Sequence, residues 1–266
     1  MSDPGLLTGT LSPPQLAGLF GVAGLLVGSF LNVCIYRLPR RESLLWPGSH
    51  CPACDRTLSW FENVPVVSWL VLRGRCRGCR APIPLQYPLV ELANSALWGL
   101  AALLTGLEWL LVVRLLFVSA LVVLFVIDLR HRILPDAITL TGIGVGLLAS
   151  FWLSPGLLAS GLGALLGGGC LWALSETYFR LRGHEGLGFG DVKMLAMIGA
   201  VLGWQQMLLT LFLASLSGSV LGVSLMALGR GGLQSALPFG TFLAVGAVVA
   251  AFGGDAMLAW YLGLYP

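Results

Sequence analysis

The sequence predicts an all-α, polytopic membrane protein with about eight transmembrane helices and one small cytoplasmic domain. Three observations lead to this fold class. Of the 266 residues, 57% are hydrophobic and only 10% are charged, whereas a soluble domain carries about 25% charged residues. Long apolar runs fill most of the chain, and one polar segment interrupts them. The alternating pattern of barrel strands is absent, so the spans are predicted to be helices.

The apolar runs define the predicted transmembrane helices. A helix needs about 17 to 25 apolar residues to cross a bilayer. The runs cover residues 14–36, 88–105, 109–127, 137–154, 157–179, 190–204, 206–228 and 238–262. The sequence therefore divides into a first transmembrane helix (1–36), a polar domain (37–87) and a helical membrane core (88–266).

The basic residues predict the orientation. Residues 1–13 contain Asp3 and no Lys or Arg, unlike the start of a signal peptide. The first run is therefore expected to remain as a helix whose N-terminus lies outside. Positive loops favour the cytoplasm, and this topology places there every basic residue except Arg114: Arg37, Arg40, Arg41, Arg56, Arg73, Arg75, Arg77, Arg80, Arg130, Arg132, Arg180, Arg182, Lys193 and Arg230. The net charge of +3 then reflects topology, and no nucleic-acid partner is expected.

Two cysteine pairs lie in the polar segment 37–87. They are Cys51-x-x-Cys54 and Cys76-x-x-Cys79, with 21 residues between the pairs. Four thiolates at this spacing suit a tetrahedral structural Zn²⁺ site. Cytoplasmic thiols stay reduced, so disulfides are not expected. The polar segment is therefore predicted to be a zinc-ribbon-like domain, and the alternative is a pair of turns without metal.

Other conspicuous residues have simpler interpretations. His50 is expected to be an ordinary surface residue, because four cysteines already complete the shell. Cys34 and Cys170 fall in helical runs and are expected to pack. The patterns Gly142-x-x-x-Gly146 and Gly163-x-x-x-Gly167 allow close approach of helices.

Two aspartates are predicted to lie at the same membrane face. Asp128 follows the run 109–127 and Asp191 begins the run 190–204, and two predicted helices separate them. An even number of crossings returns the chain to the same side. The helix 190–204 spans only about 22 Å, against about 30 Å of hydrocarbon. We therefore expect Asp191 slightly inside the membrane, after a turn permitted by Gly186, Gly188 and Gly190.

Paired carboxylates at one face indicate aspartic-protease chemistry, in which one group acts as base and the other as acid. Motifs of the H-E-x-x-H and G-x-S-x-G kinds are absent, and His50, His131 and His184 are not spaced as a catalytic metal site. Two simpler alternatives stay open. Asp191 can stabilise its own helix N-terminus, and Asp128 can pair with Arg130 or Arg132.

Several motifs together resemble the type IV prepilin peptidase family. "GLGFGDVKMLAMIGA" resembles its G-x-G-D signature, and "FVIDLRHRILPD" resembles its other aspartate motif. The N-terminal "GSFLNVCIYRLP" (28–39), "YPLVEL" (87–92) and "LPFGTFLA" (237–244) follow in the order of the family. The two cysteine pairs match its bifunctional members.

The resemblance implies a bifunctional enzyme of the bacterial cytoplasmic (inner) membrane. Such enzymes cleave the leader of prepilin or pseudopilin helices at the cytoplasmic face, then methylate the new N-terminus with S-adenosylmethionine. It assigns catalysis to Asp128 and Asp191, and leaves Asp136 and Glu176 as supporting candidates.

Two other classes of function, a transporter and an assembly scaffold, fit these residues less well. A transporter should carry polar residues near mid-membrane and inverted repeats with broken helices, whereas here the acidic residues gather at one face. A scaffold that uses zinc and glycine only for packing leaves the paired aspartates unexplained.

Overall fold

The computed structural model describes residues 11–183, 188–229 and 237–264, and these residues form helices and loops without a β-strand. Asp3, His184, Gly186 and Arg230 lie outside the described residues. The chain divides into two compact units, Met1–Phe30 with Gly48–Leu115, and Leu31–Pro47 with Leu116–Pro266. Each unit is described separately.

The first unit joins two long helices to the cysteine-rich loops. Its elements are the N-terminal part of α1 (Pro13–Arg37), η2 (Trp60–Asn63), α2 (Val67–Val71), α3 (Gln86–Thr105) and the start of α4 (Trp109–His131). The helices α1 and α3 approach closely, since a Cβ added at Gly28 would lie 2.7 Å from Cα of Glu91. Asn94 Nδ2 donates a 2.8 Å hydrogen bond to the carbonyl of Gly24. Such bonds between apolar helices stabilise membrane packing.

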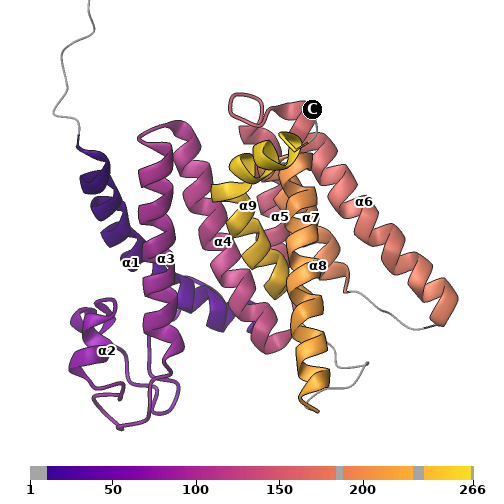
Figure 1. Cartoon of the computed structure of the whole chain (residues 1–266). Coiled ribbons are helices and arrows are strands. Elements are labelled where there is room, and N and C mark those ends of the chain that lie inside the picture. The colour runs from indigo at the N-terminus through magenta and orange to yellow at the C-terminus, as the bar shows by residue number, and fades with distance from the viewer. Residues whose placement is uncertain (1–10, 184–187, 230–236, 265–266) are drawn as a thin grey trace, which may run out of the picture. The chain divides into compact units, whose positions relative to one another are not determined.

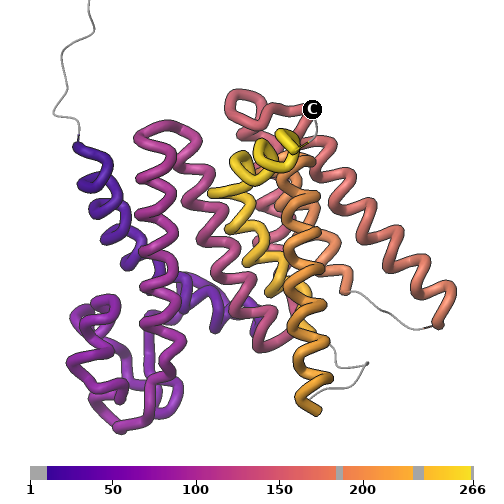
Figure 2. The backbone as a smooth tube through the Cα atoms, in the orientation of Figure 1, coloured from indigo at the N-terminus to yellow at the C-terminus, as the bar shows by residue number. Residues whose placement is uncertain are grey.

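In the described part of the second unit, four helices pack around one short helix, α7 (Phe189–Leu202), whose neighbours in sequence can be found by label in Figure 1 and by colour in Figure 2. After η1 (Leu38–Arg40) and most of α4 come α5 (Asp136–Ala149), α6 (Leu157–Arg182), α7 (Phe189–Leu202), α8 (Trp204–Ala227) and α9 (Phe239–Leu262). The helix α7 packs against α5, α6, α8 and α9. Its residues Leu195, Met197 and Ile198 are fully buried. The core of this unit therefore forms around the helix that carries Asp191.

Both predicted glycine patterns pack against α7. A Cβ at Gly167 would lie 2.7 Å from the carbonyl oxygen of Leu195, and one at Gly146 would lie 2.9 Å from that of Ala200. Gly163 meets Gly199 at still closer range. The interpretation of these glycines as close-packing residues is confirmed, and they flank α7 on two sides, from α5 and α6.

The number of full-length membrane helices is smaller than predicted. Six helices in the described part of the chain have the length and hydropathy to cross a membrane: Pro13–Arg40, Gln86–Thr105, Trp109–His131, Leu157–Arg182, Trp204–Ala227 and Phe239–Leu262. The runs 137–154 and 190–204 instead form α5 and α7, each with 14 residues. At about 21 Å both are shorter than the hydrocarbon layer. The helix α5 ends at Ala149, before its apolar run does, and α7 ends at Leu202, just before Gly203, which adopts a positive φ.

Candidate active site and metal centre

Asp128 lies in the last turn of α4 and is bound by the start of α9. Its side chain is buried, with 5% exposed. The carboxylate atom Oδ2 accepts a hydrogen bond from the backbone N–H of Thr241 at 2.7 Å and another from the Thr241 hydroxyl at 3.0 Å. Arg132, just beyond the helix, attracts the carboxylate electrostatically. Asp128 is thus fixed by a residue that lies 113 positions further along the chain.

Asp191 lies in the first turn of α7 and is also buried. The backbone N–H groups of Gly188 and Gly240 bind its carboxylate, and its charge interacts with that of Asp128. Gly188 precedes the same helix, so Asp191 lies where it can accept a hydrogen bond at its own helix N-terminus, as one of the open alternatives supposes. The contact with Gly240 goes further, because Gly240 belongs to α9.

The N-terminus of α9 therefore serves both aspartates through consecutive residues, Gly240 for Asp191 and Thr241 for Asp128. A glycine is needed there, since a Cβ at Gly240 would lie 3.0 Å from Asp128 Oδ2 and 3.0 Å from Cδ1 of Leu134. The positive end of the α9 dipole also favours negative charge at this place. The structure brings the two aspartates together at one helix end, and their catalytic roles stay predictions.

The alternative charge pair for Asp128 finds little support. The ion pairs among the described residues are Arg56–Glu62, Arg180–Glu176 and Lys193–Asp136. Asp128 takes part in none of them and instead accepts the two hydrogen bonds from Thr241.

The two supporting candidates differ in position. Asp136 begins α5 and pairs with Lys193 of α7, two residues after Asp191. Because Lys193 also lies over the ring of Phe189, this pair ties α5 to the start of α7. Glu176 pairs with Arg180 one turn along its own helix, and 38% of its side chain is exposed. A supporting role at the dyad therefore fits Asp136 and not Glu176.

The four cysteines form two matching turns in the first unit. In the first turn, the N–H of Cys51 donates to the carbonyl of Arg56 at 3.0 Å, and in the second the N–H of Cys76 donates to that of Ala81 at 2.9 Å. Asp55 and Arg80 occupy the same place in each turn, both with positive φ. This repeated geometry points each pair of thiols inward from its own loop.

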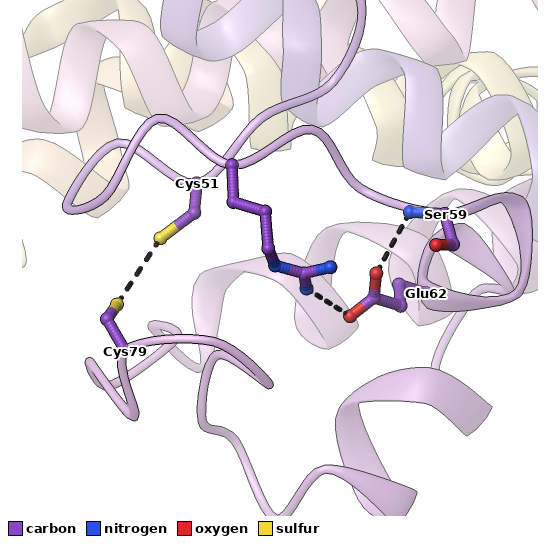
Figure 3. Close-up of polar contacts among 5 residues, drawn as sticks. Cys51, Ser59, Glu62 and Cys79 are labelled. Carbon is purple, nitrogen blue, oxygen red and sulfur yellow. Dashed lines mark hydrogen bonds and ion pairs between the residues drawn. The ribbon is translucent and has the colours of Figure 1, made fainter.

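The sulfur atoms of the cysteines fit a tetrahedral metal ion. All four lie within 4.8 Å of one another, and Cys51 and Cys79 are 3.8 Å apart (Figure 3). A Zn–S bond of about 2.3 Å gives tetrahedral edges of about 3.8 Å. The donor set and its spacing therefore match zinc. His50 Nδ1 instead contacts the carbonyl of Gly48.

An ion pair between partly exposed Arg56 and buried Glu62 supports the cysteine turns. Glu62 accepts a 2.5 Å bond from Arg56 and a 2.9 Å bond from the N–H of Ser59 (Figure 3). Chiefly through the bond from Arg56, the pKa of Glu62 falls below its usual value. The backbone N–H groups of Cys79 and Gly78 lower the pKa of Cys76 to about 6. The loop thus favours the thiolate, the form that binds metal.

Comparison with known proteins identifies the family. Residues 22–105 match the bacterial peptidase A24 N-terminal domain, and residues 115–223 match the type IV leader peptidase family. The chain is 40% identical to the prepilin leader peptidase/N-methyltransferase of Stutzerimonas stutzeri, over 91% of this chain and 92% of that protein. It is 40% identical to that of Aeromonas hydrophila, over 90% and 91%. It is 38% identical to that of Pseudomonas aeruginosa, again over 90% and 91%.

The chain belongs to the type IV leader peptidase family. No solved structure shows significant similarity to it. The match to the leader peptidase family contains both Asp128 and Asp191, and the match to the N-terminal domain contains the four cysteines. Both aspartates and all four cysteines thus lie inside matched segments, whereas Gly240 and Thr241 lie beyond residue 223.

Two residues of this leader peptidase were not assigned a role from the sequence. Thr241 lies within "LPFGTFLA", which was noted only as a motif, and Glu62 was not singled out. A threonine gives no signal of its own in an apolar run. The pattern Ser59-x-x-Glu62 did offer one, because it is a capping box, and the structure forms it.

Proposed function

We propose that this chain cleaves the leader peptide of type IV prepilins or pseudopilins with Asp128 and Asp191, and then N-methylates the new N-terminus. The observation that carries the proposal is the start of α9, where Gly240 and Thr241 each bind one of two buried carboxylates. Two carboxylates that interact in this way repel each other when both are charged, so in this proposal the pair shares one proton. One is then ready to accept a proton while the other donates one.

These two carboxyl groups alone can supply and accept every proton that the hydrolysis moves. The carboxylate takes a proton from water, the water oxygen attacks the scissile carbonyl carbon, and the protonated carboxyl gives its proton to the carbonyl oxygen. The tetrahedral intermediate then collapses. The C–N bond breaks, the nitrogen receives the proton taken from water, and the other carboxyl regains its proton from the intermediate. Both aspartates return to their initial states.

In this proposal the chemistry takes place at the cytoplasmic face. With the N-terminus outside, as the basic residues predict, the loop 37–87, the end of α4 and the start of α7 lie on the side that holds most basic residues. A substrate with a basic leader and an apolar helix fits that boundary.

Residues 37–87 form the zinc-ribbon-like domain in this proposal. Cys51, Cys54, Cys76 and Cys79 bind one Zn²⁺, which has a structural role because four thiolates leave no open position. The ion joins two loops that have little apolar core of their own.

Methyl transfer uses S-adenosylmethionine as the second substrate. The methyl group moves from the sulfonium sulfur to the new N-terminal nitrogen, which loses a proton. The relatives' names include this activity. Mass spectrometry of the processed substrate should find one added methyl group when the donor is supplied, and a product that stays unmethylated would leave only the peptidase.

The dyad is tested by asparagine substitutions in the full-length protein, purified in detergent with a prepilin substrate. Asn keeps the shape but cannot act as a base, so Asp128→Asn or Asp191→Asn should abolish cleavage. The double variant should be little worse than either single one, because the two residues act as a unit. Asp136→Asn should lower activity only mildly.

Asp255→Asn provides the matched control, because Asp255 lies near the far end of α9 and binds Gln206. It should retain cleavage. All variants should reach normal levels in the membrane. Substantial cleavage by Asp191→Asn would remove the proposed mechanism and leave Asp191 as a residue that caps its helix.

A further inference from the structure

We infer that Thr241 is a positioning residue that keeps Asp128 ionised, so that Asp128 is the base of the dyad and Asp191 carries the shared proton. This inference rests on the proposed function and deepens it, because the chemistry of an aspartate pair does not by itself say which member holds the proton.

The first argument is the number of donors at one carboxylate oxygen. Oδ2 of Asp128 accepts from the Thr241 backbone N–H at 2.7 Å and from its hydroxyl at 3.0 Å. A backbone N–H can only donate, and it leaves little room for a proton on that oxygen. Hydrogen bonds to an ionised acceptor are about twice as strong as neutral ones. Two of them therefore favour the charged form of Asp128.

The second argument is the difference between the two sites at the start of α9. Each carboxylate has two donors: the backbone N–H groups of Gly188 and Gly240 for Asp191, and the N–H and hydroxyl of Thr241 for Asp128. The difference is that one donor to Asp128 is a side chain, which Gly240 does not have. The dipole of α9 acts on both carboxylates, and that of α7 favours charge on Asp191 in its first turn. The hydroxyl bond from Thr241 and the charge of Arg132 oppose that preference. The hydroxyl of Thr241 is thus a donor for Asp128 that Gly240 cannot supply to Asp191.

The surrounding charges act in the same direction. Arg132 follows α4 and attracts the Asp128 carboxylate. The charged group that acts on Asp128 from α7 is Asp191, which repels it and so favours a proton on one of the two. Lys193, also on α7, is paired with Asp136. Arg132 and the Thr241 hydroxyl together therefore direct the shared proton to Asp191.

This assignment orders the proton transfers. Asp128 takes the proton from water, and Asp191 gives its proton to the carbonyl oxygen of the scissile bond. When the intermediate collapses, Asp128 passes its proton to the leaving nitrogen and Asp191 recovers one from the intermediate. The Thr241 hydroxyl stays bonded to Asp128 and touches no substrate atom.

The test is a pH–rate profile of Thr241→Val and Thr241→Ser, measured on the full-length enzyme with a prepilin substrate. Val keeps the size and the backbone N–H but removes the hydroxyl. Without that donor Asp128 protonates at higher pH, so the acidic limb of the profile should move to higher pH. The value of kcat should fall by about tenfold to a hundredfold, with little change in KM. Thr241→Ser keeps both donors and should restore the limb and most of kcat.

Several results would overturn the assignment. An acidic limb that stays in place in Thr241→Val would do so. So would equal damage from Ser and Val, which indicates packing alone. If Thr241→Val does not fold, Thr241→Cys replaces it, because a thiol is a weak donor and should move the limb part of the way. If the proposed function were wrong, Asp128→Asn and Asp191→Asn would still cleave the substrate. If only the role of Thr241 were wrong, both of these variants would be inactive.

Discussion

Substitution of Gly163 by Ala tests whether the contact between α6 and α7 fixes the position of Asp191. A Cβ at Gly163 would lie 2.8 Å from the carbonyl carbons of both Gly199 and Gly203, and closer still to the carbonyl oxygen of Gly199. Carbon atoms in good contact are about 3.5 to 4.0 Å apart. The overlap is therefore at least about 0.7 Å, and it falls on backbone atoms, which cannot rotate away as a side chain does.

The free-energy cost follows from this overlap. Adding a carbon to a tightly packed place costs about 1 to 3 kcal/mol, while replacing Gly by Ala within a helix gains up to about 1 kcal/mol. Gly161→Ala on the same helix is the matched control, because its Cβ would meet nothing within 4 Å. Gly161→Ala should be neutral or stabilising. Gly163→Ala should lower the thermal midpoint of the purified protein relative to it.

The effect on cleavage should exceed the effect on stability. To relieve the overlap α7 must shift by a large fraction of an ångström, and Asp191 moves with it. A misplacement of about 1 Å can cost about a hundredfold in rate. The assays are a thermal melt in detergent and the initial rate of prepilin cleavage. If Gly163→Ala melts and cleaves like Gly161→Ala, then this contact does not position the dyad.

Two further predictions concern the cysteine-rich loops. Cys79→Ser should remove the metal, whereas the control Cys170→Ser should keep it. Elemental analysis should therefore find zinc in the wild type and in Cys170→Ser but not in Cys79→Ser. Equal zinc in all three proteins would contradict the site. In the Arg56–Glu62 pair, the pKa of Glu62 is lower in the folded protein than in the unfolded chain. The pair therefore stabilises the fold fully above the unfolded pKa of about 4.3, and this stabilisation is lost as the pH falls through the pKa of folded Glu62. Glu62→Gln should therefore speed hydrogen exchange of residues 56–62 at pH 7, and the difference from wild type should shrink below about pH 4; a difference that does not change with pH would mean that the charge is irrelevant.

Much about this protein could be predicted from the sequence because the signals are local. Hydropathy is a property of consecutive residues, so the apolar runs and the helical class could be read directly. Cysteine spacing limits how four thiols can meet, and the structure brings Cys51, Cys54, Cys76 and Cys79 within 4.8 Å. Counting the helices between Asp128 and Asp191 placed both at the same face, because an even number of crossings does so whichever way the protein is oriented.

The rest depended on contacts between distant segments. The short length of α7 could be read from its apolar run, but the end of α5 at Ala149, inside the apolar run 137–154, could not, because hydropathy does not register where a helix stops. Thr241 contacts Asp128 across 113 positions, and no local pattern announces such a pair. The asymmetry of the dyad arises there, because Gly240 and Thr241 are neighbours in the sequence yet reach different aspartates. Only the position of the start of α9 beside Asp128 and Asp191 decides which carboxylate gains the hydroxyl donor.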